Sequence, residues 1–292
     1  MISNNPLKNT FGRNIRNFLF GSFGSSVTIF TLGFSVFKLP LLQSVGLGFV
    51  LLILLFSFRF AYYLCKDLVY YIHNTYVDSI WGMAIIELKD AYANMHYLRK
   101  QEQITDDDFM IALVTFCETL KSIFDRKTKG NCCVSIKVPA GIFTSLQTWE
   151  LCNLCRDRAH SFRDTKDYEN MNHTIIGNTP YTVIINRLLD TRRKFKPYYL
   201  NNDIENTKDY MNTSERLYSN GLPYKSELVY AILPIKNDEE HRYDLAGFLC
   251  IDCDKKNVFD EKRYDIPMVE GIVDGIYDII VRRNKQILIS NN

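Results

Sequence analysis

The chain has 292 residues, of which 47% are hydrophobic and 23% charged, and its formal net charge is +2. That length suits one ordinary domain with additional segments. The small net charge and the scattered basic residues exclude the strong positive field of a typical nucleic-acid reader. We therefore expect no nucleic-acid partner.

Two uncharged runs stand near the N-terminus, over residues 17–37 and 39–58. Each is close to the roughly 20 residues that an α-helix needs to cross a bilayer, and only the short turn at Lys38 and Pro40 divides them. The sequence predicts a transmembrane helical hairpin within residues 17–63, with a lipid bilayer as partner. The alternative is a pair of buried or re-entrant helices.

Basic residues flank this hairpin on one side. Three precede the first run and two follow the second, whereas only Lys38 lies between the runs: Lys8, Arg13, Arg16, Arg59 and Lys66. The positive-inside rule therefore places segment 1–16 and the chain after the hairpin in the cytoplasm, at an inner or plasma membrane. The eight cysteines then face a reducing compartment and are predicted to be free thiols.

Residues 64–103 form a predicted helical connector, since they contain no proline and one glycine, Gly82. An apolar stripe recurs on it at three- and four-residue steps, at Ile85, Leu88, Tyr92 and Met95. Such a stripe requires a partner. Two alternatives stay open, namely packing on the following domain and packing on a second copy in a homo-oligomer.

Residues 104–284 are predicted to form one soluble domain, followed by a tail at 285–292. Thr105 is a helix cap before an apolar face that runs from Phe109 to Phe124. Alternating or apolar runs then predict strands at "CCVSIKV", "WELCNLCRD", "KSELVYAILPI" and "LAGFLCIDC", with a short helix at "NTPYTVIINRLLD" between them. The last two strands form a predicted hairpin, and a helix from about Asp265 to Arg283 closes the domain. The fold class is antiparallel α+β.

This order resembles the GAF family of small-molecule sensor domains. The marks are the opening helix, the strands "CCVSIKV" and "YKSELVYAILPI", the strand "LAGFLCIDC", the turn "NVFDEKRYD" and the closing helix "VEGIVDGIYDII". The resemblance implies a GAF-like sheet that backs a pocket for a small ligand, such as a nucleotide, a tetrapyrrole or a metabolite. It also implies terminal helices that dimerise and relay the bound state. Neither His160 nor His173 has an adjacent cysteine, which argues against a covalent bilin.

Two C-x-x-C pairs raise the question of a zinc site, at Cys152 and Cys155 and at Cys250 and Cys253. Both pairs fall inside predicted strands, where side chains three residues apart point to opposite faces. We therefore favour small buried side chains over a zinc or redox role, and we predict no metal and no cofactor.

Polar and aromatic residues near the predicted strand ends are the candidate ligand contacts. Arginines bind phosphates and carboxylates in bidentate fashion, while amides and aromatic rings read a ring edge and stack on its face. The alternative for each group is a solvated strand edge or a packed turn. The candidates are Arg156, Arg163, Tyr199, Asn202, Asp203, Tyr210, Ser226 and Asp252.

No catalytic motif appears around the histidines, and no glycine-rich phosphate loop is present in the sequence. The sequence therefore predicts that the chain is not an enzyme. The predicted function is a membrane-anchored cytoplasmic sensor that binds a small ligand and signals through its helices. The alternative is an antiviral or stress effector whose first span disrupts the membrane when a nucleotide messenger binds.

Overall fold

The computed structural model describes residues 40–140, 149–163, 173–190, 196–213, 221–234 and 244–290. The predicted cytoplasmic segment 1–16 and the first predicted span lie outside the described residues, as does most of the loop between the last two predicted strands. The chain divides into two units, Met1–Ser79 and Ile80–Asn292. The second unit contains the sheet and the candidate site.

One continuous helix, α2, runs from Leu41 to Lys100. It confirms the helices predicted for the second span and for the connector. By length and composition, it is the one helix of the described residues that is able to cross a membrane. Large apolar side chains on this stretch are exposed, among them Phe49, Leu54 and Phe58. The predicted hairpin is not shown, because its other half lies outside the described residues.

The last five turns of α2 belong to the folded domain. The ring of Trp81 lies edge-on to Phe124 with centroids 6.3 Å apart, and Tyr92 lies edge-on to Phe116 at 5.4 Å. The buried face consists of Ile80, Trp81, Ala84, Leu88, Ala91, Met95 and Leu98. Of the two alternatives for the stripe, the structure therefore shows packing on the chain's own domain.

The predicted stripe has the wrong phase at two positions. Leu88 and Met95 are buried as predicted, but Ile85 is 72% exposed and Tyr92 is 37% exposed. The helix instead turns two alanines, Ala84 and Ala91, toward the domain. Small side chains permit close approach of neighbouring helices, so the buried stripe does not follow the largest residues.

Helix α3, Asp106–Thr128, opens the compact part of the domain as predicted. The Thr105 hydroxyl oxygen accepts a hydrogen bond from the Asp108 backbone N–H at 3.1 Å, which caps the helix. The predicted apolar face from Phe109 to Phe124 is buried. The closing helix α5, Asp265–Ser290, continues beyond its predicted end at Arg283, so residues 285–290 of the predicted tail are helical.

Six strands form one antiparallel sheet with the order β3-β2-β1-β6-β5-β4. The strands are β1 (Cys132–Pro139), β2 (Glu150–Arg156), β3 (His173–Thr174), β4 (Tyr198–Asn201), β5 (Ser226–Ile232) and β6 (Gly247–Cys253). The four strands expected from the sequence are confirmed, and β5 pairs with β6 as the predicted hairpin requires. The short edge strands β3 and β4 were not predicted. The antiparallel α+β class is confirmed.

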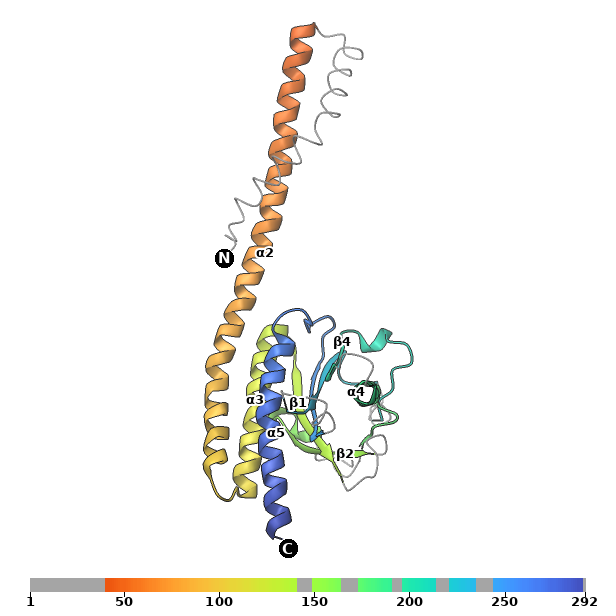
Figure 1. The fold of residues 1–292 in the computed structure, drawn as a ribbon. Helices are drawn as coiled ribbons and strands as arrows, with labels where there is room; N and C mark the ends of the chain where they lie inside the picture. The colour runs from red at the N-terminus through yellow and green to blue at the C-terminus, as the bar shows by residue number, and fades with distance from the viewer. Residues whose placement is uncertain are drawn as a thin grey trace. The chain divides into compact units, whose positions relative to one another are not determined.

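Helices cover both faces of this sheet (Figure 1): α3 and α5 lie together on one face, and α4, Thr179–Leu189, lies on the other. An apolar cluster on the α4 face includes Tyr181, Ile184, Val229 and Phe248. The strand β6 must begin with glycine. A Cβ at Gly247, whose φ is +153°, would lie 2.2 Å from the Lys137 carbonyl oxygen.

Candidate functional site

A cavity of about 550 Å³ lies against the sheet face that α4 covers. Its wall is formed by residues of β1, β2, β5 and β6, the N-terminal end of α4 and the 3-10 helix η2, Arg158–Arg163. Three residues of α3, His173 of β3 and the loop residues Asn212 and Tyr224 complete it. Volumes of this size are typical of small-molecule sites. The wall carries both charged and apolar groups.

Strand register places a row of polar side chains across this face. Glu227 on β5 lies directly opposite Asn201 on β4 and Asp252 on β6, and Asp252 lies opposite Cys133 on β1. Residues that are directly opposite in an antiparallel pair share one face. Two carboxyl groups are thereby held side by side in a buried part of the sheet, an arrangement that disfavours ionisation of both.

The arginines of the wall are engaged with other wall groups. Nη1 of Arg163 lies 3.3 Å from Oδ2 of Asp252, and Nη1 of Arg156 donates to Sγ of Cys133 at 3.6 Å. Burial raises the pKa of Asp252, while Arg163 and Arg156 oppose that rise. The positive charge on this part of the wall thus serves chiefly to balance Asp252.

Glu227 is 4% exposed, and its Oε1 atom has no hydrogen-bond partner among the described residues. Burial raises the pKa of Glu227 to about 8, the neighbouring Asp252 raises it as well, and the Tyr210 hydroxyl opposes the rise. The side chain is consequently protonated at neutral pH. It is a buried acid on the wall of a cavity.

Four tyrosines surround Glu227. Burial raises the pKa of each hydroxyl, and the charge of Glu227 raises it further, at Tyr181, Tyr199, Tyr210 and Tyr224. Tyr181 and Tyr224 line the cavity itself. Their hydroxyls are occupied: Tyr181 Oη lies 3.5 Å from Cys250 Sγ, and Tyr224 Oη accepts from Asn212 Nδ2 at 2.6 Å. These two residues therefore contribute mainly aromatic surface.

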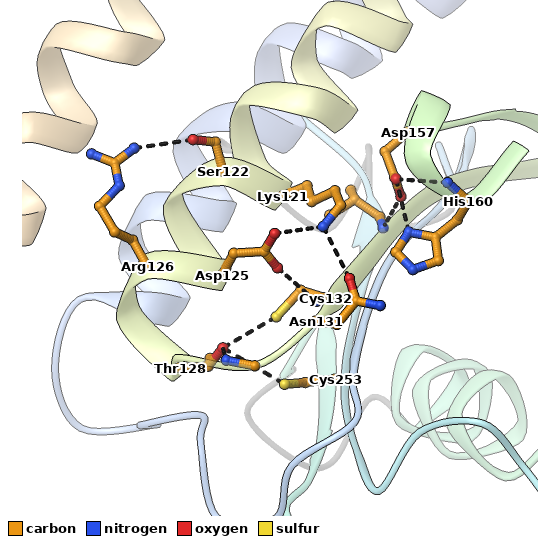
Figure 2. Close-up of polar contacts among 12 residues, drawn as sticks. Lys121, Ser122, Asp125, Arg126, Thr128, Asn131, Cys132, Asp157, His160 and Cys253 are labelled. Carbon is orange, nitrogen blue, oxygen red and sulfur yellow. Dashed lines mark hydrogen bonds and ion pairs between the residues drawn. The ribbon is translucent and has the colours of Figure 1, made fainter.

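Asp157 and His160 form a buried pair beside the row, with Nδ1 of His160 at 2.8 Å from Oδ1 of Asp157 (Figure 2). The Asp157 carboxylate also accepts from the backbone N–H groups of Val134 and His160. Burial opposes ionisation of Asp157, but the hydrogen bonds from His160 and Val134 prevail and lower its pKa. Asp157 thus fixes the start of η2 on β1.

Cys133 completes a group of three with Asp157 and His160, since the candidate ligand atoms lie within 4.8 Å of one another. Thiolate, imidazole and carboxylate are ligands that zinc accepts. Burial raises the pKa of the Cys133 thiol well above its usual value. The Asp157 oxygens already accept backbone hydrogen bonds, so the arrangement is explained by its role in the fold.

The C-x-x-C pair on β6 has its thiols on opposite sides of the sheet. Cys250 Sγ lies near Tyr181 of α4, whereas Cys253 Sγ lies 3.6 Å from Thr128 Oγ1 of α3 (Figure 2). This confirms, for this pair, the prediction that side chains three residues apart on a strand point to opposite faces. Burial raises the pKa of Cys250 to about 11, and a hydrogen bond from Cys132 lowers that of Cys253 to about 7.

Of the eight predicted ligand contacts, Arg156, Arg163 and Asp252 lie on the cavity wall. Tyr199 and Tyr210 lie near Glu227 and are not among the wall residues. The structure thus brings five of the predicted residues to one region of the α4 face.

The other three predicted contacts have partners elsewhere. Asn202 exchanges two hydrogen bonds with the backbone of Phe259, at 2.8 and 3.0 Å, and Asp203 forms an ion pair with Lys256 at 2.8 Å. Ser226 donates to the Lys255 carbonyl at 2.6 Å. Ser226 precedes Glu227 on the strand, so its side chain points to the opposite face. These three residues fasten loops to the sheet.

The sequence analysis missed Glu227, Tyr181 and Tyr224. A signal for Glu227 exists in "SELVYAI", because Glu227 alternates with Val229 and Ala231 and so occupies the same face as two apolar residues. An acid in that position requires a reason. No comparable local signal marks the two tyrosines, since their place depends on how α4 and the segment before β5 fold over the sheet.

No family model and no curated protein sequence matches the chain. Solved structures do. It is similar to the GAF domain from an Acinetobacter phosphoenolpyruvate-protein phosphotransferase, with 8% identity, a TM-score of 0.42, and coverage of 72% of this chain and 98% of that one. It is also similar to a putative GAF sensor protein from Burkholderia vietnamiensis, at 10% identity and a TM-score of 0.39 over 71% and 94% of the two chains.

A third similar structure is an enzyme. It is the free methionine-R-sulfoxide reductase from Neisseria meningitidis, with 10% identity, a TM-score of 0.42, and coverage of 70% of this chain and 93% of that one. The prediction that the chain is not an enzyme is contradicted by this finding. The prediction rested on the lack of a catalytic motif around the histidines and of a glycine-rich phosphate loop, and structures similar to this chain include reductases.

Proposed function

We propose that the domain is a GAF-like sensor whose cavity binds a small molecule, and that α2 anchors it to a membrane and carries its signal. The observation that supports ligand binding most strongly is the cavity of about 550 Å³ with buried polar groups on its wall. Buried polar groups without partners cost free energy. On this wall such an atom is Oε1 of Glu227, which has no hydrogen-bond partner among the described residues, and a bound ligand that donates to it accounts for its presence.

The signalling part of the proposal rests on helix continuity. The turns of α2 that pack on α3 and α5 belong to the same uninterrupted helix as the apolar stretch. Tyr92 and Met95 of α2 lie against Phe116 of α3 and Gly275 of α5, respectively. A ligand that shifts the packing of α3 on the sheet therefore acts on α2 directly. Dimerisation through these helices and cytoplasmic placement of the domain are part of the same proposal.

Ligand binding is tested by thermal unfolding of the detergent-purified full chain against a library of nucleotides, amino acids and amines. We expect at least one compound to raise the melting temperature by about 5 °C at a hundred times its dissociation constant. The substitution Val229→Phe, which fills the cavity, should abolish this shift. Leu228→Ala, which weakens the opposite face of the same strand, should lower the melting temperature and leave the shift intact. An equal shift in both variants would refute a site in this cavity.

Membrane anchoring is tested by cell fractionation. The full chain should sediment with membranes and resist extraction by alkaline carbonate, because the exposed apolar surface of α2 is unfavourable in water. A variant that lacks residues 17–58 should move to the supernatant. Recovery of the full chain in the supernatant without detergent would contradict the anchor.

A further inference from the structure

Glu227 places a buried acceptor atom, Oε1, on the cavity wall, and the neighbouring Tyr210 hydroxyl lies outside hydrogen-bond geometry with it. Its two cross-strand neighbours are satisfied, since Asn201 donates to Thr207 Oγ1 at 2.9 Å and Asp252 pairs with Arg163. Oε1 of Glu227 has no hydrogen-bond partner among the described residues, although the side chain is 4% exposed. An unsatisfied buried acceptor is strongly unfavourable. The partner it lacks is expected to come from a ligand.

The charges around this oxygen define what the ligand must supply. The groups of the described chain that act on Glu227 are Asp252 and Tyr210, and no cation is among them. Of the cations on the cavity wall, Arg163, Arg156 and Arg158 contact Asp252, Cys133 and Glu118, respectively. Lys137 lies four residues along β1 from Cys133, opposite Phe248. A negative group on the ligand would face two carboxyl groups, whereas a positive group would supply the missing hydrogen bond and favour the ionised form of Glu227.

Aromatic surface is the second requirement. Tyr181 and Tyr224 line the cavity near Glu227, and their hydroxyls are engaged with Cys250 and Asn212. Rings of this kind attract a cation placed over their faces, and the attraction grows when the cation is removed from water. A buried acid beside tyrosine rings is therefore suited to an organic cation.

We propose that the cavity binds a small organic molecule that carries a protonated amine, with its N–H groups donating to Glu227 and its nitrogen against the rings of Tyr181 and Tyr224. This inference rests on the proposed function, that the cavity is a ligand site. It specifies the chemical class of the ligand, which the fold does not.

Binding of such a molecule is coupled to a proton. Glu227 has a pKa of about 8. The ammonium group requires the carboxylate, so binding below that pH releases a proton. Affinity should rise about tenfold per pH unit from pH 6 toward 8 and then level off. The other ionisable groups of the wall are Tyr181, Tyr224, Cys155, Cys250, Asp252, Arg156, Arg158, Arg163, Lys137 and His173, and Tyr210 also acts on Glu227. The variant Glu227→Gln separates their titration from that of Glu227.

The test uses n-butylammonium chloride as the probe and n-butanol as its neutral counterpart, with the detergent-purified full chain and NMR titration. We expect the amine to bind at least about tenfold more tightly than the alcohol, as a charge-assisted hydrogen bond implies. In Glu227→Gln the preference should disappear. Glu261→Gln, at a surface acid paired with Lys196, should retain it. Tyr224→Leu should weaken amine binding in a domain whose acid is intact.

Two results would overturn the inference. One is equal binding of the amine and the alcohol by the unmodified chain, and the other is an undiminished preference in folded Glu227→Gln. The failure of the proposed function has a different signature. If adenosine monophosphate or another library compound binds and Val229→Phe abolishes that binding, the cavity is a ligand site and only the amine class is wrong.

Discussion

Replacing Glu227 with glutamine should remove a large pH dependence of stability. The folded-state pKa of Glu227 is about 8, above its ordinary value of 4.5, so the folded protein holds a proton that the unfolded chain releases. The stability contributed by the protonated group is fully present below about pH 4.5 and is lost as the pH rises to about 8. The free energy of unfolding should therefore fall by about 2 to 3 kcal/mol between pH 5 and 7 through this group alone.

The measurement is denaturant unfolding of the full chain and of Glu227→Gln at several pH values. Glutamine has nearly the same shape and stays neutral, so the difference in free energy of unfolding between variant and parent should increase steadily with pH. Glu261→Gln serves as the control, because Glu261 lies at the surface in an ion pair with Lys196. Such pairs contribute at most about 1 kcal/mol. A difference curve for Glu227→Gln that is flat with pH would contradict the buried, protonated acid.

Removing residues 80–103 should prevent the rest of the domain from folding. Five large side chains of α2 are buried against the domain: Ile80, Trp81, Leu88, Met95 and Leu98. Each contributes about 1.5 to 3 kcal/mol on burial, and together they rival the 5 to 15 kcal/mol of a typical domain. A fragment of residues 104–292 should aggregate or lack a cooperative transition, whereas a fragment of residues 80–292 should unfold cooperatively by circular dichroism.

Two substitutions on neighbouring turns of α2 test the packing of this helix on the domain without truncating the chain. Leu88→Ala should cost about 2 to 5 kcal/mol, as large-to-small changes in a core do. Ile85→Ala should cost less than about 1 kcal/mol, because Ile85 is 72% exposed. If the 104–292 fragment melts within a few degrees of the longer one, or if the two substitutions cost the same, the packing described for α2 is wrong.

The sequence predicted those helices and strands that carry a cap or a clear hydrophobic period within their own residues. The Thr105 cap and the acidic first turn mark the start of α3, and alternation marks β1, β5 and β6. The strands β3 and β4 escaped prediction because each is too short to show a period, and β4 merges with the asparagine-rich stretch after it. Their formation depends on pairing with β2 and β5, which is information from distant parts of the chain.

Some residues of the candidate site could likewise be predicted from the sequence, and others could not. Charged residues at strand ends pointed to Arg156, Arg163 and Asp252, which do lie on the cavity wall. Asn202 and Asp203 are also polar residues at the end of a strand, yet their side chains bind the backbone of Phe259 and the side chain of Lys256. The sequence pattern alone does not distinguish an amide side chain that binds a ligand from one that stabilises a turn. Glu227 was missed because its significance comes from Asp252 opposite it and from tyrosines supplied by three other segments.

Binding of a small molecule at Glu227, in the cavity on the α4 face, can be measured by amide hydrogen exchange of the full chain with and without n-butylammonium. We expect slower exchange confined to peptides of β5, β6 and the N-terminal end of α4, and no such change in Glu227→Gln. Unchanged exchange in those peptides at saturating amine, or protection that persists in Glu227→Gln, would contradict it.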